Sequence, residues 1–322
     1  MGNAGLFKTA QPIFSLKAID NSYIKGCILT GLKEKYTGNL TSGKILENKI
    51  VNFLIEETCA TNQIACEIAI KKMGAIMNIV YHPMLFCRND RPLYNVAGIL
   101  GAQSDLVLLS STSLFCLKKL TSLSSSPSLN ILNCAQCPSL SFAAMMCIYE
   151  RFRRFENLNV SLIGRPYPYF NSLLLLLPRL NVNARILTGI TENSRISPRY
   201  FAVAQDFAIQ AGREILDCRS LAEALDGANV VMVSQNIWDG FKLYMEDIQK
   251  YCDKDWCFFH DPFDGSLFDC DLFGHENTMS FKLIENLRWA YFTIILEVFR
   301  MRFPECAEKI AKLQCKEEAS FK

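Results

Sequence analysis

Residues 50–74 are the first place to look for chemistry, because they predict a buried strand, a turn and a helix in succession. A turn that leads from a parallel strand into a helix exposes free backbone N–H groups, and such helix starts bind phosphate. The side chains of the predicted turn are Cys59, Ala60, Thr61, Asn62 and Gln63. None of them is positively charged. The stretch therefore has the frame of a phosphate site without the cations that would hold a dianion.

Cysteine is the second residue type that could do chemistry, with 14 copies in the chain. Several lie in apolar periodic segments, among them Cys66, Cys116 and Cys147, as is typical of reduced core thiols in a protein of this size. Cys134 and Cys137 form a CxxC pair. A zinc or redox role would need a second pair or a histidine at metal spacing to support it. We therefore predict no metal site and no cofactor.

Composition and charge exclude several classes of partner. Half of the 322 residues are hydrophobic, and the 34 Lys and Arg residues exceed the 32 Asp and Glu residues by only two. Such a balance gives no global field to attract nucleic acid or an anionic membrane. The longest obvious apolar run, 173–177, ends at Pro178, well short of the roughly 18 to 20 residues of a membrane helix. We expect no nucleic-acid partner, no membrane insertion and a cytoplasmic location.

The elements that position these residues alternate regularly between strand and helix. The predicted strands are 50–55, 75–81, 106–109 and 129–132, then 160–163, 184–187, 214–216, 230–233 and 256–260. The predicted helices are 65–73, 93–102, 113–120 and 142–155, then 170–180, 198–211, 221–225 and 281–303. This alternation predicts an α/β protein with two doubly wound parallel sheets. A helix at 19–32 and a turn-rich connector at 37–44 precede the first strand, and a surface helix follows Pro304.

Six segments, in order, resemble the aspartate and ornithine carbamoyltransferase family. The first, LIEETCATNQIACEIAIKKMGA, matches F-E-x-S-T-R-T-R-x-S-F-E-x-A-x-x-x-L-G, with Glu57, Glu67 and Gly74 in register. RRFENLNVSLIGR resembles the interdomain segment, and Ser172 and Leu173 match the Ser-Leu pair that follows it. The other three are SLAEALDGANVVM, HDPFDGSLF and ENLRWAYFTIILEVF, which are similar to x-x-E-A-x-x-G-A-D-V-V-Y, H-x-L-P and E-N-R-x-x-A-Q-x-x-L-L.

The resemblance implies two doubly wound domains of the aspartate/ornithine carbamoyltransferase type. Residues 1–145 would form the carbamoyl-phosphate domain, with the C-terminal helices at 284–315 packing back on it, and 146–283 the amino-acid domain. Family members share active sites between neighbours in a trimer that the first domain holds together. A homotrimer, or a heteromeric protein partner, is therefore expected.

The positions that match the family's substrate-binding residues have lost their arginines and several of their polar groups. The two arginines of S-T-R-T-R fall on Thr61 and Gln63, and its first Ser and Thr fall on Cys59 and Ala60, while Asn62 takes the second Thr. The remaining positions are Ser110 for a strand-end arginine, Cys137 and Leu140 for the His and Gln of H-P-T-Q, His260 and Pro262 for H-x-L-P, and Leu287 for the arginine of E-N-R, with Arg288 one residue late. One residue turns a helical side chain by about 100°.

Three hypotheses remain open at this stage. The first, which we favour, is a catalytically inactive scaffold or interaction protein. The second is a divergent carbamoyltransferase that draws its cations from Arg88, Arg91, Arg165, Arg288 and Lys71. The third is a small-molecule binder that uses an apolar cleft lined by Cys59, Cys137, Leu140, Pro262 and Phe263.

Overall fold

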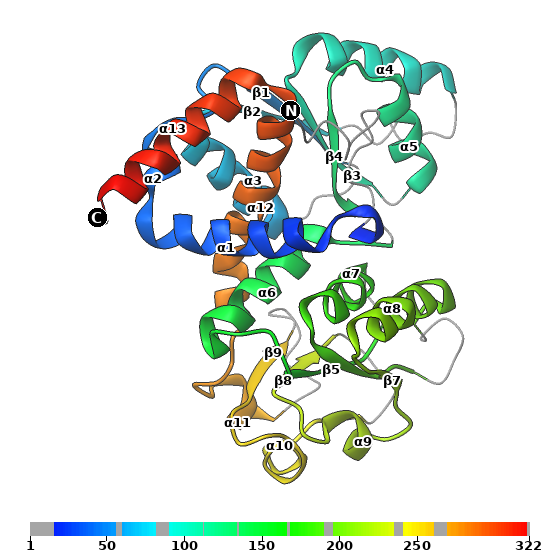
Figure 1. The fold of residues 1–322 in the computed structure, drawn as a ribbon. Coiled ribbons are helices and arrows are strands. Elements are labelled where there is room, and N and C mark those ends of the chain that lie inside the picture. Colours follow the sequence, from blue (N-terminus) through cyan, green and yellow to red (C-terminus); the bar gives the residue numbers. More distant parts are fainter. Residues whose placement is uncertain are drawn as a thin grey trace. The chain divides into compact units, whose positions relative to one another are not determined.

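Two parallel β-sheets, each with its own helices, organise the chain (Figure 1). The computed structural model describes residues 16–55, 60–81, 90–111, 113–133, 135–165, 168–189, 196–234, 241–260 and 269–320. The chain divides into two compact units. The first contains Gly26–Cys134 and Leu287–Lys322, and the second contains Leu16–Lys25 and Ala135–Asn286. The predicted fold class, α/β with two parallel sheets, is confirmed.

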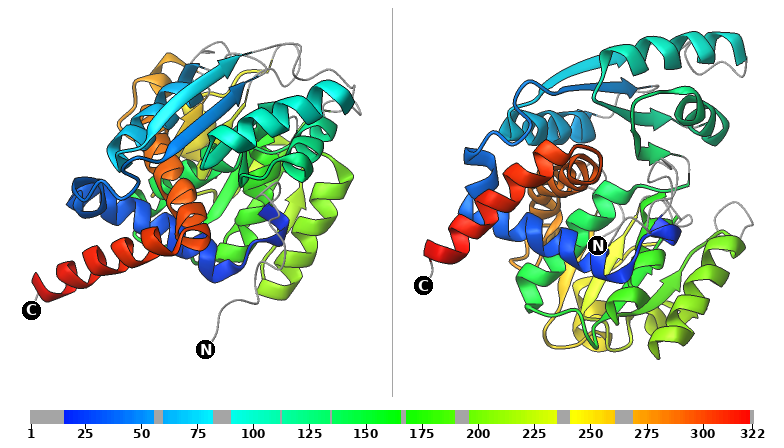
Figure 2. Two further views of the ribbon diagram at one scale, coloured as in Figure 1. Left: turned by 90° about the horizontal axis from the view of Figure 1, so that it is seen from above. Right: turned by 45° about the horizontal axis from the view of Figure 1, so that its top comes forward.

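The first sheet has the strand order β2-β1-β3-β4 and is parallel throughout. Its strands are β1 (Ile50–Ile55), β2 (Ile76–Tyr81), β3 (Leu106–Ser111) and β4 (Ser128–Asn133). Figure 2 shows the arrows of β1 and β2 side by side. Ile55 pairs with both Tyr81 and Ser110, so the carboxyl ends of three strands lie at one edge. That edge is where ligands bind in open parallel sheets.

Apolar helix faces cover the first sheet. Leu54, Val107 and Leu109 form a buried cluster with α4 (Asp90–Gln103) and α5 (Leu114–Leu123). The other helices that lie wholly in this unit are α2 (Asn39–Ser42), α3 (Ala60–Met73) and α13 (Pro304–Ser320). Gly74, with a φ of +84°, ends α3 in the left-handed conformation that glycine adopts at little cost.

Two long helices contribute to both units. They are α1 (Asn21–Thr37) and α12 (Ser280–Arg302), and each is continuous across the division of the chain. In the first unit the buried carboxylate of Glu34 on α1 accepts hydrogen bonds from the backbone N–H groups of Leu40 (2.9 Å) and Thr41 (2.7 Å). These two groups begin α2 and have no acceptor within that helix, so Glu34 caps it.

The second sheet has the order β7-β6-β5-β8-β9. Its strands are β5 (Asn159–Ile163), β6 (Asn183–Leu187), β7 (Ile215–Asp217), β8 (Val230–Val233) and β9 (Cys257–His260). The helices α7 (Pro168–Leu176) and α8 (Pro198–Ala211) lie on one face, and α9 (Leu221–Leu225) and α10 (Met245–Tyr251) on the other (Figure 1). The remaining elements are η1 (Leu16–Ala18), α6 (Pro138–Phe152), η3 (Pro178–Leu180) and α11 (Cys270–Phe273).

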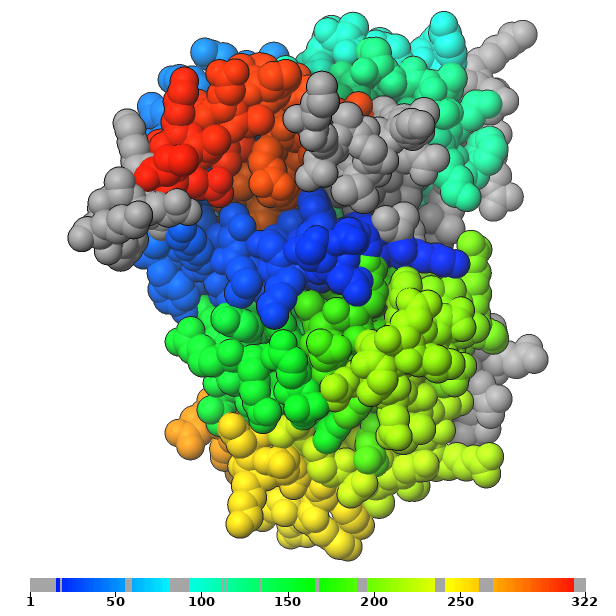
Figure 3. Space-filling model, viewed as in Figure 1, coloured from blue at the N-terminus to red at the C-terminus, as the bar shows by residue number. Residues whose placement is uncertain are grey.

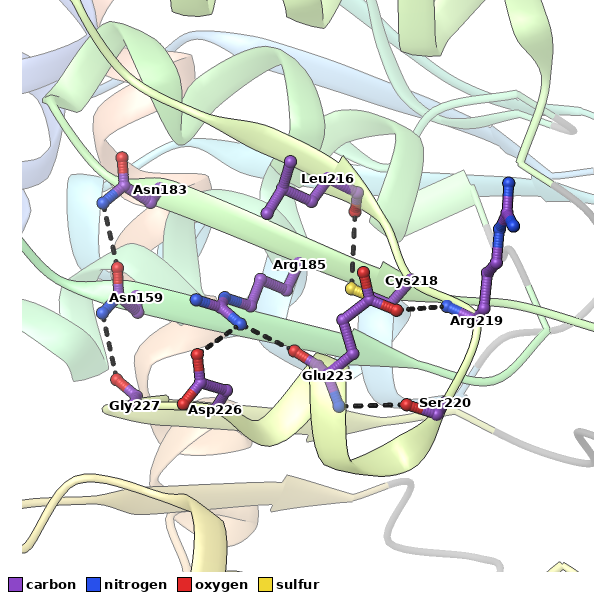
Figure 4. A network of polar contacts seen from close by, with 10 residues as sticks. All are labelled: Asn159, Asn183, Arg185, Leu216, Cys218, Arg219, Ser220, Glu223, Asp226 and Gly227. Carbon is purple, nitrogen blue, oxygen red and sulfur yellow. Dashed lines mark hydrogen bonds and ion pairs between the residues drawn. The ribbon is translucent and has the colours of Figure 1, made fainter.

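Polar contacts fasten α9 to the strands beside it (Figure 4). Ser220 begins this short helix, and its hydroxyl accepts the N–H of Glu223 at 3.2 Å, as Ser does at helix starts. Arg185 of β6 donates to the Glu223 carbonyl at 2.8 Å and pairs with Asp226 at 3.0 Å. This network is structural, because each member binds a neighbouring backbone or side-chain group.

Several predicted elements end at the predicted residues, and a few predictions need correction. The boundaries of β1, α8, α9 and β8 match. The connector at 37–44 was expected to be turns but contains α2, since Glu34 supplies a cap from outside the segment. The single helix expected at 170–180 is interrupted before Pro178, which starts η3. The sequence pattern also missed α10 and α11.

The predicted domain boundaries stay a prediction, and the boundary after residue 145 lies inside α6. Within the described ranges, no helix is both long and apolar enough to cross a membrane.

Candidate functional site

The start of α3 holds the residues that match the family's phosphate-binding turn. Ala60 is exposed, Thr61 and Gln63 are half-buried, and Asn62 is only 9% exposed. The Asn62 side-chain oxygen accepts a 2.6 Å hydrogen bond from the hydroxyl of Tyr291 on α12, within the first unit. Asn62 therefore connects two helices. The turn residue Cys59 lies outside the described residues.

The two predicted site residues on α12 have different surroundings. Leu287, which the resemblance aligns with the family's arginine, is fully buried. Arg288 is half-buried, and its guanidinium carbon lies 6.0 Å from the centre of the Trp289 ring. A cation at that distance from an indole face is attracted to the ring. Lys72 of α3 approaches the same ring at 5.2 Å. The Trp289 ring of α12 therefore has one cation of its own helix and one cation of α3 close to it.

Serine side chains at the end of β3 bind the start of the next helix. Ser110 is buried and lies beside Ile55 at the carboxyl edge of the sheet. The hydroxyl of Ser111 accepts the Ser113 N–H at 3.0 Å, and the Ser113 hydroxyl caps α5 by accepting the Cys116 N–H at 3.3 Å. The strand end therefore supports a helix cap, and the described residues at this position bring no positive charge.

In the second unit, Cys137 and Leu140 lie at the start of α6. Cys137 is the N-cap and is buried, and its backbone N–H donates to the Ser172 hydroxyl at 2.9 Å. Its thiol lies 3.8 Å from the Ser139 hydroxyl. Leu140 is half-buried. Ser172, the serine of the Ser-Leu pair in the family resemblance, thus binds the N-terminus of α6.

His260 ends β9 and is 4% exposed. Its backbone N–H donates to the Ser280 hydroxyl at 2.9 Å. Its ring centre lies 5.1 Å from that of Phe273 and 5.8 Å from that of Phe258, so the imidazole packs among aromatic rings. Pro262 and Phe263 lie outside the described residues.

Of the basic residues proposed as alternative cations, the described side chains are those of Lys71, Arg165 and Arg288. Lys71 forms a surface ion pair with Glu67 at 2.7 Å, one helical turn away. Arg165 is exposed after β5. Arg88 lies outside the described residues, as does the side chain of Arg91. The structure therefore leaves the predicted site residues as predictions and shows what most of them contact.

The thiol of Cys66, on α3, is fully buried. Full burial raises the pKa of the Cys66 thiol in α3 well above its ordinary value, because a thiolate would lose its hydration. The described residues contain no cluster of three or more His, Cys, Asp or Glu side chains that could hold a metal ion.

Comparison with solved structures decides the fold. The mitochondrial ornithine carbamoyltransferase of Coccidioides immitis superimposes with a TM-score of 0.82 at 18% identity, covering 90% of this chain and 98% of that one. The ornithine carbamoyltransferase of Pyrococcus furiosus gives a TM-score of 0.81 at 16% identity, covering 89% and 96%. The chain has the carbamoyltransferase fold.

Sequence comparison points the same way. The ornithine carbamoyltransferase of Prochlorococcus marinus is 23% identical over 196 residues, or 60% of this chain. The match spans 61% of the length of that relative. No family model matches the chain. The similar sequences and the similar structures are thus ornithine carbamoyltransferases alike, and the chain shares their fold.

Tyr291 is the residue that sequence reasoning missed. In E-N-R-x-x-A-Q it falls where the carbamoyltransferase pattern has Gln, directly after Ala290, which is in register. The replacement of an amide by a phenol on a buried helix face was the available signal. Together with Asn62, it shows that two of the altered segments contact each other.

Proposed function

We propose that this chain is a carbamoyltransferase relative that does not transfer carbamoyl groups and that acts as a self-assembling, non-catalytic protein. The observation that carries the proposal is the side-chain chemistry at the described family positions. Thr61, Gln63, Ser110 and Leu287 stand where the family has four arginines. Leu287 is buried and apolar, and neighbouring Asn62 is bound to Tyr291.

Electrostatics explains why these substitutions remove the activity. Carbamoyl phosphate carries a nearly dianionic phosphate, and transfer of its carbonyl requires stabilisation of a developing oxyanion. A hydrogen bond from a charged donor contributes about 1.5 to 3 kcal/mol. The dipole at the start of a helix contributes about 0.3 to 1 kcal/mol to a nearby anion. The helix start alone therefore cannot replace four guanidinium groups.

The free edge of the first sheet supports self-assembly. β2 is an edge strand, and the large apolar side chains of Ile76, Ile79 and Tyr81 are exposed on it. Ile64 of α3, a helix that packs beside β2, is exposed as well. Uncharged edge strands of this kind are prone to pair with another chain. We propose a second copy as the occupant, because family trimers are held together by the first domain.

Ligand binding tests the loss of the phosphate site. Unfolding of the full chain is followed with increasing carbamoyl phosphate, since a ligand at a hundredfold excess over its dissociation constant stabilises by about 2.7 kcal/mol. We expect no shift for the natural chain and tighter binding for Thr61→Arg/Gln63→Arg. Ile64→Arg, which adds a charge at an exposed neighbouring position, is the control and should bind no better than the natural chain. Saturable stabilisation of the natural chain would contradict the proposal.

The mass of the native protein tests the proposed self-assembly. Light scattering should give a multiple of the 36.5 kDa chain, with a trimer at three times that value. Ile79→Lys on β2 should lower the mass, whereas Ile99→Lys, at an exposed position on α4, should leave it unchanged. A monomeric natural chain, or equal effects of the two variants, would count against assembly through β2.

A further inference from the structure

A cavity of about 500 Å³ opens in the second unit, away from the carboxyl ends of its strands. Phe155 and Glu156 line it just before β5, and Asn181 lines it just before β6, so it lies at the amino-terminal edge of the sheet. Residues of α1 and α8 also line the cavity. Figure 3 shows the start of the described chain, in dark blue, against the green surface of this unit. A site here is separate from the carboxyl edge of the sheet, where ligands bind in open parallel sheets.

Arg179 is the buried cation of this cavity and is 9% exposed. Its Nε donates to the Asn21 side chain and its Nη1 to the Leu16 carbonyl, both at 2.6 Å. Its guanidinium carbon lies 4.9 Å from the centre of the Phe207 ring. A guanidinium has five N–H donors, and two have acceptors among the described residues. The three others, including both on Nη2, remain available to a bound anion.

Burial makes this charge costly without a bound anion. Desolvation lowers the pKa of Arg179, partly offset by the carboxylate of Asp20. Asp20 does not line the cavity, and its own side chain accepts hydrogen bonds from Ser22. A charged group removed from water gains most from an ion that makes further hydrogen bonds to it. The cavity therefore favours a negatively charged occupant.

A second cation stands at the mouth of the cavity. Lys25 pairs with Glu156 at 3.5 Å, and both side chains are about half exposed. Exposed pairs at such separations contribute little to stability, so a ligand anion can replace Glu156 as the partner of Lys25. The remaining wall offers the rings of Phe155 and Phe207 and the side-chain amide of Gln210.

We propose that this cavity binds a small organic anion, with its carboxylate or phosphate between Arg179 and Lys25 and a flat apolar portion against the phenylalanine rings. The volume suits a metabolite-sized ligand, since such sites range from about 300 to 1,000 Å³. The proposal concerns the second unit alone and does not depend on whether carbamoyl transfer has been lost.

Titration calorimetry of the full chain tests the site with three probes: phenyl phosphate, benzoate and neutral benzyl alcohol. Phenyl phosphate and benzoate should bind saturably with one site per chain, and benzyl alcohol at least about tenfold more weakly, because it lacks the charge-assisted hydrogen bonds. Inorganic phosphate, run in parallel, reports the contribution of the anion without the ring. Absence of saturable binding by both anionic probes would overturn the proposal.

Three variants assign the binding to the cavity. Lys25→Gln changes an exposed side chain and should weaken the binding of phenyl phosphate about tenfold. Phe207→Leu should weaken the binding of phenyl phosphate more than that of inorganic phosphate. Arg179→Lys keeps the positive charge but removes the planar guanidinium group, and it should weaken the binding of both phenyl phosphate and inorganic phosphate. Lys118→Gln, an exposed lysine of the first unit, is the matched control. Binding that survives Lys25→Gln and Phe207→Leu unchanged would place the probes elsewhere and refute the site.

Discussion

Replacing Tyr291 by Phe should destabilise the first unit by about 1 to 3 kcal/mol. The phenol ring is 1% exposed, and the substitution keeps its packing while deleting the hydroxyl that donates to Asn62 at 2.6 Å. A hydrogen bond contributes about 0.5 to 1.5 kcal/mol net, and a buried polar group that loses a partner costs about 1 to 3 kcal/mol. The Asn62 side chain is 9% exposed, so little water can replace the hydroxyl.

A double-mutant cycle isolates the contribution of this one contact. Tyr291→Phe, Asn62→Ala and the double variant are unfolded in urea, and tryptophan fluorescence reports on α12 through Trp289. If the bond joins the two helices, the second substitution costs less once the first has been made. We expect a coupling energy of about 1 to 2 kcal/mol, within the range seen for residues in contact.

Tyr94→Phe provides the matched control, because that tyrosine is exposed on α4, and its change should stay within about 0.5 kcal/mol. The Asn62–Tyr291 hydrogen bond would not hold α3 and α12 together if Tyr291→Phe were as stable as the natural chain. The same would follow if the free-energy changes of the two substitutions were fully additive. The residues found at the start of α3 in place of the family's motif would then need another explanation.

Two further predictions concern packing and thiol reactivity. Gly98→Ala on α4 should stabilise the chain by about 0.4 to 1 kcal/mol, because the added methyl group has open space around it. Gly101→Ala on the same helix should destabilise the chain, because its methyl group would lie 2.9 Å from a backbone nitrogen. The urea midpoints of the two variants give the comparison. Burial raises the pKa of Cys218 to about 11 and that of Cys252 to about 12, so at pH 8 both thiols are almost entirely protonated and hence slow to react. Iodoacetamide labelling at pH 8, read by mass spectrometry, should modify exposed Cys270 and Cys315 before Cys218 and Cys252, and early labelling of Cys218 or Cys252 would contradict this order.

The alternation of apolar strands and amphipathic helices was sufficient to predict most of the fold. Strands such as β1 and β8 are buried on both faces and read as apolar runs, interrupted in β1 by Asn52 alone, so their limits are visible in the sequence. The limits of α8 were equally clear, because Pro198 begins it and Gly212 follows it. These elements carry their start and stop signals within their own residues.

The missed elements depend on residues that are distant in sequence. α2 is four residues long, and it is capped by Glu34, which belongs to the preceding helix. α11 is equally short, and no periodic pattern emerges from four residues. Short helices of this kind are set by tertiary contacts, which local propensity does not record.

For the candidate site, the sequence predicts a loss of charge, which stays a prediction, and it does not show what the substituted residues contact. The loss of charge at Thr61 and Gln63 follows from alignment with the family motif. The bond between Asn62 and Tyr291 joins residues 229 positions apart and is visible only in the structure. The cavity beside Arg179 was missed for the same reason, because its walls come from segments that are separate in the sequence.

Direct assay of carbamoyl transfer is the decisive measurement. Purified full-length chain is incubated with carbamoyl phosphate and either ornithine or aspartate, and citrulline or carbamoylaspartate is quantified against a heat-denatured sample. Without arginine at the positions of Thr61, Gln63, Ser110 and Leu287, product should form at the rate of the denatured control. Turnover in the range typical of enzymes, about 1 to 1,000 per second, or any rate proportional to native protein, would contradict the proposed loss of catalysis.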